Sequence, residues 1–288
     1  MHVLITGAGG SLGTALVPDL ADQHKLRLSD VEDLQTDHEF MKVDVRDPDQ
    51  IHAAAQGVDA IIHTPAWHGV HTDERTEREF WELNVDGTFN TLEAAVANDV
   101  SKVVFASSQA ALAGVSGKYA FTKLVGENIC EYFVRNHENL YAIAVRPAAF
   151  AIHTGDRKTY GERLLRNAVD RRDVVGVTRA ALENTMIEWG AYPAVRDDPY
   201  TEAELEQWSE DPSSVLENYV EGAGCLIEEY SIDLPEEVNP NGGFQGTTMD
   251  TTREELGYDA DRTFIQFLEN LKNHDAEGSA EAWLASDV

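Results

Sequence analysis

Residues 2–13 read HVLITGAGGSLG, an apolar run that leads directly into a glycine-rich segment. The run His2–Thr6 has the composition of a buried strand, and apolar residues recur at helical spacing over Ser11–Gln23. Gly7, Gly10 and Gly13 therefore fall between a strand and a helix. Glycines at these places permit a tight turn, a close backbone approach to a pyrophosphate and a helix amino terminus aimed at it. The stretch predicts a dinucleotide-binding turn.

The rest of the first half repeats this alternation of strand and helix. Further apolar runs predict strands at Leu26–Ser29, Glu39–Val43, Ala60–His63, Lys102–Ala106 and Tyr141–Val145. Helical spacing predicts helices at Pro48–Ala55, Phe80–Asn98 and Tyr119–Asn136. Strands that are apolar throughout and alternate with helices are typical of a parallel sheet covered on both faces. We expect a doubly wound α/β fold.

The pattern changes after Pro147. Helices are predicted at Gly161–Asp170, Asp173–Leu182 and Thr201–Ser209, and an amphipathic helix at the end of Thr252–Leu271. We expect a nucleotide-binding domain over residues 1–150, to which residues 171–190 return. Residues 151–273 are predicted to form a smaller substrate-binding lobe over the carboxyl edge of the sheet, where open α/β folds bind ligands, and residues 274–288 an acidic tail.

The chain is strongly acidic, with 52 Asp and Glu against 22 Lys and Arg and a formal net charge of −30 over 288 residues. Such a surface repels nucleic acids and anionic membranes, so we expect neither as a partner. The acids are spread along the chain rather than gathered in a tail. At ~1 M salt the Debye length falls to about 3 Å, which screens their mutual repulsion. We interpret the composition as halophilic.

Compartment and metal content are predicted from simple features. The start of the chain has no basic segment before its apolar run, and no apolar run approaches the ~20 residues that cross a membrane. Cys130 and Cys225 stand alone, which favours a reducing, cytoplasmic location. His68, His71 and Asp73 could ligate a metal, but histidines in an acidic loop are more often solvated, and we expect no metal.

Two acidic positions bear on the choice of cofactor. Asp30 ends the second predicted strand, where a carboxylate can bind the adenosine ribose 2′-hydroxyl and would repel a 2′-phosphate. This favours NAD over NADP, although Asp30 could also do no more than cap its loop. Asp44 and Val45, after the third strand, are expected near the adenine.

Tyr119 and Lys123 stand four residues apart and share a helix face. A nearby ammonium favours the phenolate, so we expect Lys123 to lower the pKa of Tyr119 and make it a general base. A surface pair is the alternative. Upstream, Ser107 and Ser108 end the fifth strand, where one hydroxyl could orient the reacting group.

With these motifs in order, the chain resembles the extended branch of the short-chain dehydrogenase/reductase superfamily. The resemblance covers roughly residues 1–149, and more weakly 173–182 and 252–271. It rests on TGAGGSLG (6–13), NVDGT (84–88), VVFASS (103–108), YAFTK (119–123) with Glu127 beyond it, and Arg146-Pro147. It implies a Rossmann fold, bound NAD and a homodimer formed through the helices Phe80–Asn98 and Tyr119–Asn136.

The resemblance also implies roles for single residues. Tyr119 would be the acid/base, Lys123 would hold the ribose and lower the pKa of Tyr119, and Ser108 would bind the substrate oxygen, with Ser107 as the alternative. The residues that would bind NAD are Gly7, Gly10, Ser11, Leu12, Gly13, Asp30, Asp44, Val45, Thr64, Pro65, Ala66, Asn84, Tyr119, Lys123 and Pro147. Trp67 and His68 are weaker candidates for substrate contact.

One departure from the family pattern concerns the substrate side. Only 11 positions separate Ser108 from Tyr119, and Ala113-Gly114 stands where an aromatic-glycine pair is common. The stretches LRLSD, NVDGTFNTLEAA and KVVFASS look most similar to uronate and aldose dehydrogenases, which oxidise a sugar at C1 with NAD. The alternatives are a nucleotide-sugar epimerase or dehydratase that keeps its NAD, and a non-catalytic NAD sensor.

Overall fold

The computed structural model describes residues 1–153, 156–244 and 246–277. The chain divides into two compact units, each built from three segments. Unit 1 comprises Met1–Pro147, Val174–Pro193 and Thr251–Tyr258. Unit 2 comprises Ala148–Asp173, Ala194–Asp250 and the chain from Asp259.

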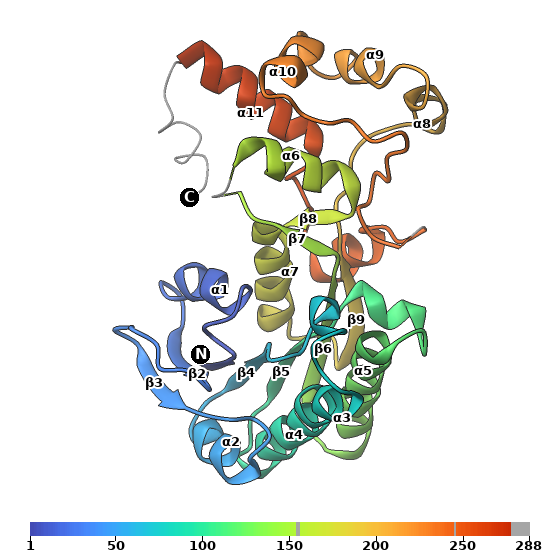
Figure 1. Ribbon diagram of the computed structural model, residues 1–288. Helices are drawn as coiled ribbons and strands as arrows, with labels where there is room; N and C mark the ends of the chain where they lie inside the picture. The colour runs from blue at the N-terminus through green and yellow to red at the C-terminus, as the bar shows by residue number, and fades with distance from the viewer. Residues whose placement is uncertain (154–155, 245, 278–288) are drawn as a thin grey trace. The chain divides into compact units, whose positions relative to one another are not determined.

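A seven-stranded sheet in the order β3-β2-β1-β4-β5-β6-β9 lies at the centre of unit 1 (Figure 1). Its strands are β1 (His2–Thr6), β2 (Lys25–Asp30), β3 (Glu39–Lys42), β4 (Ala60–His63), β5 (Lys102–Ala106), β6 (Tyr141–Pro147) and β9 (Trp189–Ala194). Strands β1 to β6 pair in parallel, with Ile5 opposite Leu28 on one side and Ile62 on the other. The strand order reverses between β1 and β4, the kind of switch point at which open α/β sheets bind ligands. The predicted doubly wound parallel fold is confirmed.

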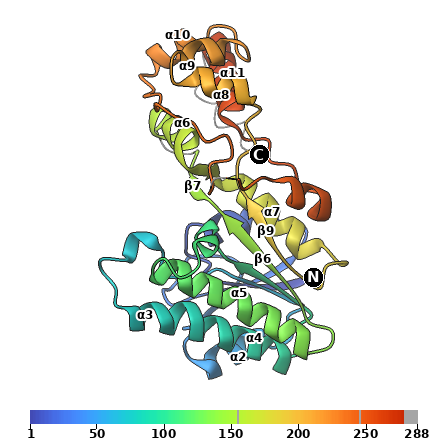
Figure 2. The ribbon, with the colours of Figure 1, turned by 90° about the vertical axis from the view of Figure 1, so that its right-hand side faces the viewer.

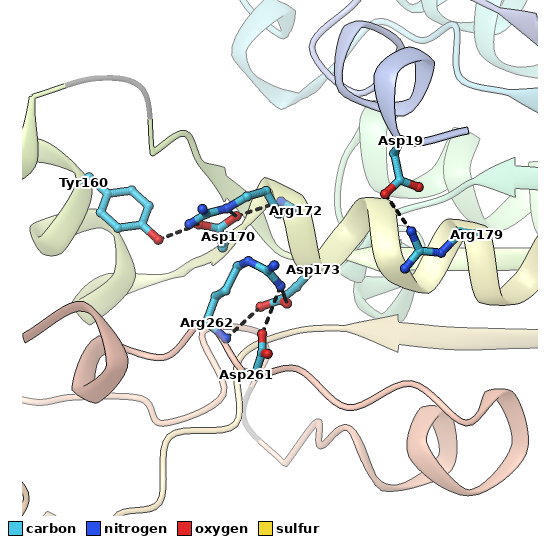
Figure 3. A network of polar contacts seen from close by, with 8 residues as sticks. All are labelled: Asp19, Tyr160, Asp170, Arg172, Asp173, Arg179, Asp261 and Arg262. Atoms are coloured by element: carbon cyan, nitrogen blue, oxygen red, sulfur yellow. Dashed lines mark hydrogen bonds and ion pairs between the residues drawn. The ribbon is translucent and has the colours of Figure 1, made fainter. Parts of the chain in front are cut away.

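Helices cover both faces of this sheet (Figures 1 and 2). One face carries α1 (Gly13–Leu20) and α7 (Arg171–Glu183), and the other carries α2 (Pro48–Ala55), α4 (Gly87–Ala97) and α5 (Lys118–Asn136). Apolar side chains of the sheet pack against α2, α4 and α5 in one core, which includes Leu4, Val103 and Phe133. On the other face, Arg179 of α7 donates to Asp19 of α1 across 2.6 Å (Figure 3).

The predicted helix over Phe80–Asn98 is interrupted. The structure has α3 (Glu77–Trp81), a π-helical turn over Glu82–Asp86, and then α4. Such turns accommodate an extra residue and often mark functional sites. Here the turn contains the buried side chain of Asn84. A sequence pattern with period 3.6 does not distinguish it from a regular helix.

Unit 2 has its own core. Its elements are β7 (Ala149–Ala151), α6 (Arg157–Arg166), β8 (Ala168–Asp170), α8 (Glu202–Trp208), α9 (Pro212–Glu217), α10 (Ala223–Glu229) and α11 (Phe264–Glu277). Strands β7 and β8 form a short parallel pair. Trp208, Phe264 and Leu268 are fully buried among the helices. Of the predicted acidic tail, the part beyond residue 277 lies outside the described residues.

The prediction of a helix over Gly161–Asp170 is wrong at its carboxyl end. Helix α6 stops at Arg166, and Ala168–Asp170 is strand β8. Asp170 explains the change, because its buried carboxylate accepts from Tyr160 and from the side chain of Arg172 at 2.8 Å (Figure 3). These partners come from both flanks of the strand, and pairing with β7 completes it.

A second difference is strand β9 at the edge of the sheet, which the sequence analysis did not predict. Its sequence WGAYPA contains a glycine and a proline, both of which weaken a strand pattern. A place at the edge tolerates proline, because the missing N–H faces away from the ladder. Backbone pairing beside β6 therefore decides this element.

Candidate active site

The glycine turn between β1 and α1 is tightly packed. Gly7 has a positive φ of 68°, and its carbonyl accepts from the Gly10 N–H at 3.0 Å. A Cβ on Gly13 would lie 2.5 Å from that carbonyl oxygen. The Thr64 hydroxyl, at the end of β4, closes the turn by donating to the carbonyl of Thr6 at 2.8 Å. The glycines thus leave the backbone N–H groups uncovered by side chains at the amino end of α1, as a pyrophosphate site requires.

Asp30 lies against this turn. Its Oδ2 accepts from the Gly9 N–H at 2.9 Å and its Oδ1 from the Glu32 N–H at 3.1 Å. A Cβ on Gly9 would approach the same carboxylate to 3.1 Å. The carboxylate is therefore held in one orientation at the end of β2. This fixed negative charge beside the turn fits NAD better than a cofactor with a 2′-phosphate.

Asp44 and Val45 follow β3. The Asp44 carboxylate is paired with Arg46, whose Nη2 approaches it to 2.5 Å, and this hydrogen bond holds the pKa of Asp44 below its usual range. Val45 is buried, and a Cβ on Gly87 would come within 2.9 Å of its methyl group. Both side chains are thus engaged within the protein.

Asn84 joins the segment after β4 to helix α5. Its Oδ1 accepts from the Trp67 N–H at 2.8 Å, and its Nδ2 donates to the Trp67 carbonyl at 2.9 Å and to Thr122 Oγ1 at 3.0 Å. Pro65 lies against the glycine turn, with its Cγ 3.1 Å from the position of a Cβ on Gly7. Three of the predicted residues, Thr64, Pro65 and Ala66, thus lie in the segment after β4. The fourth, Asn84, is joined to the same segment through Trp67.

The structure separates the two candidate serines. Ser107 is buried, and its hydroxyl donates to Glu127 Oε1 at 2.5 Å. Ser108 instead begins the 3₁₀ turn Gln109–Ala113, where its Oγ accepts from the Ala110 N–H at 3.1 Å, and its hydroxyl acts to lower the pKa of Tyr119. Ser108 is the serine that meets the predicted base.

Tyr119 and Lys123 lie on the first two turns of α5, but they do not interact as predicted. Lys123 is buried and its Nζ donates to the carbonyl of Ala106 at 2.6 Å, at the end of β5. Burial raises the pKa of Tyr119, and only the hydrogen bond with Ser108 acts in the opposite direction. The expected lowering of the Tyr119 pKa by Lys123 is therefore wrong for this structure. Burial also lowers the pKa of Lys123 itself, to about 7.

The sequence analysis named Glu127 and Arg146 among the family motifs but assigned them no role beneath the site. Glu127 is buried one turn beyond Lys123, and its carboxylate takes two hydrogen bonds from Arg146, at 2.8 and 2.6 Å, besides that of Ser107. Arg146 is the next-to-last residue of β6. The last residue, Pro147, is buried. An acid spaced four residues after the lysine, inside an otherwise apolar helix face, was the available signal.

Residues 3–175 match the NAD dependent epimerase/dehydratase family, which is more than half of the chain. The chain belongs to this family. The match covers the glycine turn, the Asn84 turn and the Ser108–Lys123 segment just described. It confirms the predicted family and the prediction of NAD as the cofactor.

Relatives found by sequence comparison include sugar dehydrogenases, a 3 beta-hydroxysteroid dehydrogenase/isomerase and a UDP-glucose 4-epimerase. The chain is 41% identical to a uronate dehydrogenase of Pseudomonas syringae pv. tomato over 112 residues, which are 37% of this chain and 39% of the relative. It is 33% identical to an L-arabinose 1-dehydrogenase (NAD(P)⁺) of Haloferax volcanii over 108 residues, 37% of this chain and 41% of the relative. The matched region thus spans about two fifths of each of these two sugar dehydrogenases.

Solved structures agree on the fold of this family member over nearly its whole length. A short-chain dehydrogenase/reductase superfamily protein of Agrobacterium tumefaciens with bound NAD aligns with a TM-score of 0.72 at 20% identity, covering 98% of this chain and 99% of that one. A UDP-galactose 4-epimerase aligns with a TM-score of 0.66 at 20% identity, covering 96% and 99%. Both likenesses concern the fold.

Two structural features are absent from the described ranges, 1–153, 156–244 and 246–277. Within them, no helix is long and apolar enough to cross a membrane. Nor does any group of three or more His, Cys, Asp and Glu side chains in these ranges have the arrangement of a metal site.

Proposed function

We propose that this protein is an NAD-dependent dehydrogenase that oxidises the C1 hydroxyl of a sugar or sugar acid. The single observation that carries the proposal is the hydrogen bond of Lys123 Nζ to the Ala106 carbonyl at 2.6 Å, because it holds helix α5, with Tyr119, at the end of β5 just before Ser108. Lys123 lies one turn further along the same helix. The names of the uronate and arabinose dehydrogenase relatives support a sugar as the substrate.

The proposed roles follow from the donors and acceptors present. Bound NAD would supply the hydride acceptor. Ser108 Oγ would hold the substrate oxygen, and Tyr119 would take the hydroxyl proton as the C–H electron pair leaves as hydride. The glycine turn and Asp30 would bind the cofactor, for which the bare backbone and the fixed carboxylate are suited.

Lys123 would contribute through its position. Its amino group is fixed at the Ala106 carbonyl, directly before Ser107 and Ser108. Because burial raises the pKa of Tyr119, the phenol is protonated at neutral pH in this structure. A base must be deprotonated to accept a proton, so we expect the oxidation rate to rise with pH above neutrality.

The test is a spectrophotometric assay of the full chain at ~2 M KCl, with NAD or NADP and a panel of aldoses, uronates and simple alcohols. We expect reduction of NAD, a preference for NAD over NADP, and activity with one class of sugar. Tyr119→Phe should abolish turnover and leave the Kd for NAD within about twofold, because the variant removes one hydroxyl outside the glycine turn.

Two results would reject this function. Turnover that survives in Tyr119→Phe would show that another group is the base. The second result is a wild-type protein that carries tightly bound NAD, reduces none of it with any free sugar and converts a nucleotide sugar. This result would identify an epimerase or dehydratase, the activities in the name of the family.

We also propose a homodimer formed through α3, α4 and α5. Four aromatic side chains on these helices are exposed: Trp81, Phe89, Phe121 and Tyr132. They gather in two places, because Phe89 and Tyr132 both contact the Phe133 ring, at 5.3 and 5.6 Å, and Trp81 lies 6.3 Å from Phe121. Exposed aromatics are enriched at protein interfaces. Light scattering should give twice the chain mass, and Tyr132→Arg should shift it toward the monomer.

A further inference from the structure

The segment that follows β4 forms a loop fastened to α5 at two points. Near its start, Asn84 bonds both backbone groups of Trp67 and reaches Thr122 on α5 at 3.0 Å. Near its end, Lys118 Nζ donates to the Arg75 carbonyl at 2.6 Å. Thr122 and Lys118 flank Tyr119 on the helix. The loop over residues 67–75 is therefore held in register with the proposed base.

Residues of the same loop also contact one another. The Arg75 guanidinium lies 4.2 Å from the centre of the Trp67 ring, a cation–π contact. The His71 ring meets Trp67 edge-on at 5.2 Å, and its Nδ1 accepts from the His68 N–H at 2.9 Å. These contacts fix the backbone of His68 from both sides.

His68 is the residue that this scaffold presents to Tyr119. The centroids of the two rings are 5.9 Å apart and the rings are inclined by 52°. A Cβ on the next residue, Gly69, would come within 3.7 Å of Cδ1 of Tyr119, so the turn runs along the edge of the tyrosine ring. His68 packs against Tyr119 on one side, but the residue keeps part of its surface exposed, so it remains accessible to a ligand.

The protonation state of His68 suits recognition of a hydroxyl group. Burial lowers the pKa of His68 to about 4, with the charges of Lys123 and His71 acting in the same direction. Its imidazole is then neutral near pH 7, with one donor and one acceptor nitrogen, the pair of groups that a hydroxyl can satisfy. The neighbouring cations are already engaged, Lys118 at the Arg75 carbonyl and Arg75 at Glu79 across 3.0 Å.

We propose that His68 determines specificity by hydrogen-bonding a second hydroxyl of the substrate, close to the one that Tyr119 deprotonates. The proposal rests on the proposed function. It assigns the loop 67–75 as a preformed wall of the substrate site. His68 contacts the substrate directly, whereas Trp67, His71 and Arg75 are positioning residues that act through it.

The experiment combines variants of the full chain with monodeoxy analogues of whichever sugar the wild type oxidises. Wild-type kcat/KM should fall about tenfold or more for the analogue that lacks the contacted hydroxyl. His68→Ala should lower kcat/KM for the parent sugar by a similar factor and show no additional loss with that analogue. It should keep its discrimination against the other analogues, its Kd for NAD and its Tm.

Two further variants separate recognition from folding. His68→Gln, which keeps a donor and an acceptor, should recover part of the lost discrimination. His52→Ala is the matched histidine control, since His52 lies on α2 and contacts Asn98 rather than this loop. It should leave every ratio unchanged.

The outcomes distinguish this proposal from the proposed function. If the wild type oxidises a sugar and His68→Ala discriminates among all the analogues as the wild type does, the role of His68 is wrong and the function stands. If the variant loses activity equally on every analogue together with NAD affinity or Tm, His68 is structural and the proposal is again wrong. A wild type that oxidises no sugar overturns both.

Discussion

Lys123 shows how one residue can be costly to the fold and necessary to the proposed function. Its side chain is almost fully buried, and burial lowers its pKa to about 7 from an ordinary value near 10.5. Between pH 7 and about 10.5 the unfolded chain therefore holds a proton that the folded chain has released. The contribution of Lys123 to stability therefore rises with pH across this window, and it is least favourable below it, where the ammonium is charged and buried.

Replacing this residue tests that conclusion. Lys123→Met removes the buried charge, and we expect the free energy of unfolding to rise by about 1–3 kcal/mol at pH 6. The difference should shrink as pH rises from 7 toward 10.5, because the buried lysine of the folded wild type is then neutral and the unfolded lysine also approaches neutrality. Urea titrations at several pH values measure it. A variant less stable than the wild type at pH 6, or a difference independent of pH, would contradict the account; NADH formation should be lost in either case.

The choice between Ser107 and Ser108 shows a limit of sequence reasoning at this scale. The two serines are adjacent and chemically identical, so composition and spacing could not separate them. Their roles depend on Glu127 and Tyr119, which lie 20 and 11 positions away. The direction of the Tyr119 pKa was missed for the same reason, because burial and the bond from Lys123 to Ala106 arise only in the folded chain.

At the scale of elements, the glycine turn was fully predictable, because its requirements are local. A strand, a positive φ at Gly7 and a helix amino end follow one another within residues 2–13. The buried strands β1, β4 and β5 were equally clear, since continuous apolar runs have few other interpretations. Strands β8 and β9 were not, because pairing and buried ion contacts decide them.

A matched pair of glycine substitutions tests the turn. Gly13→Ala places a Cβ 2.5 Å from the Gly7 carbonyl oxygen and 2.6 Å from Cα of Ala8, both backbone atoms. We expect the free energy of unfolding to fall by about 2 kcal/mol or more and the Kd for NAD to rise at least tenfold. Thermal denaturation and NAD titration measure the two effects.

The control for this substitution is Gly224→Ala in α10. There the nearest atom to a new Cβ is a side-chain oxygen of Glu217 at 3.5 Å, an ordinary contact. Alanine is the better helix former, so stability should stay the same or rise by up to about 1 kcal/mol. Equal destabilisation by both substitutions would mean that the turn has no special packing requirement.

At the scale of the whole molecule, charge is the dominant feature. A formal net charge of −30 produces self-repulsion that weakens the compact state in dilute buffer. Relatives of this chain include dehydrogenases of Haloferax volcanii. We propose that the protein is adapted to concentrated salt, in which the Debye length becomes shorter than the spacing between most surface charges.

Salt should therefore stabilise the protein through screening. We expect Tm to rise by about 10 °C or more between 0.1 and 2 M KCl, as differential scanning fluorimetry can follow. Sucrose at equal osmolality controls for solvent exclusion and should produce a clearly smaller shift. A Tm that falls with KCl, or that rises equally in sucrose, would show that screening of the acidic surface is not the cause.

The central claim is that Tyr119 of α5 abstracts a proton from the sugar hydroxyl while a hydride leaves the sugar for NAD. The most direct test uses an accepted aldose deuterated at C1, incubated with NAD, and mass spectrometry of the reduced cofactor. We predict one deuterium per reduced cofactor with the wild type and no labelled product with Tyr119→Phe. Reduced cofactor without deuterium, or labelled product from the Tyr119→Phe variant, would contradict the account.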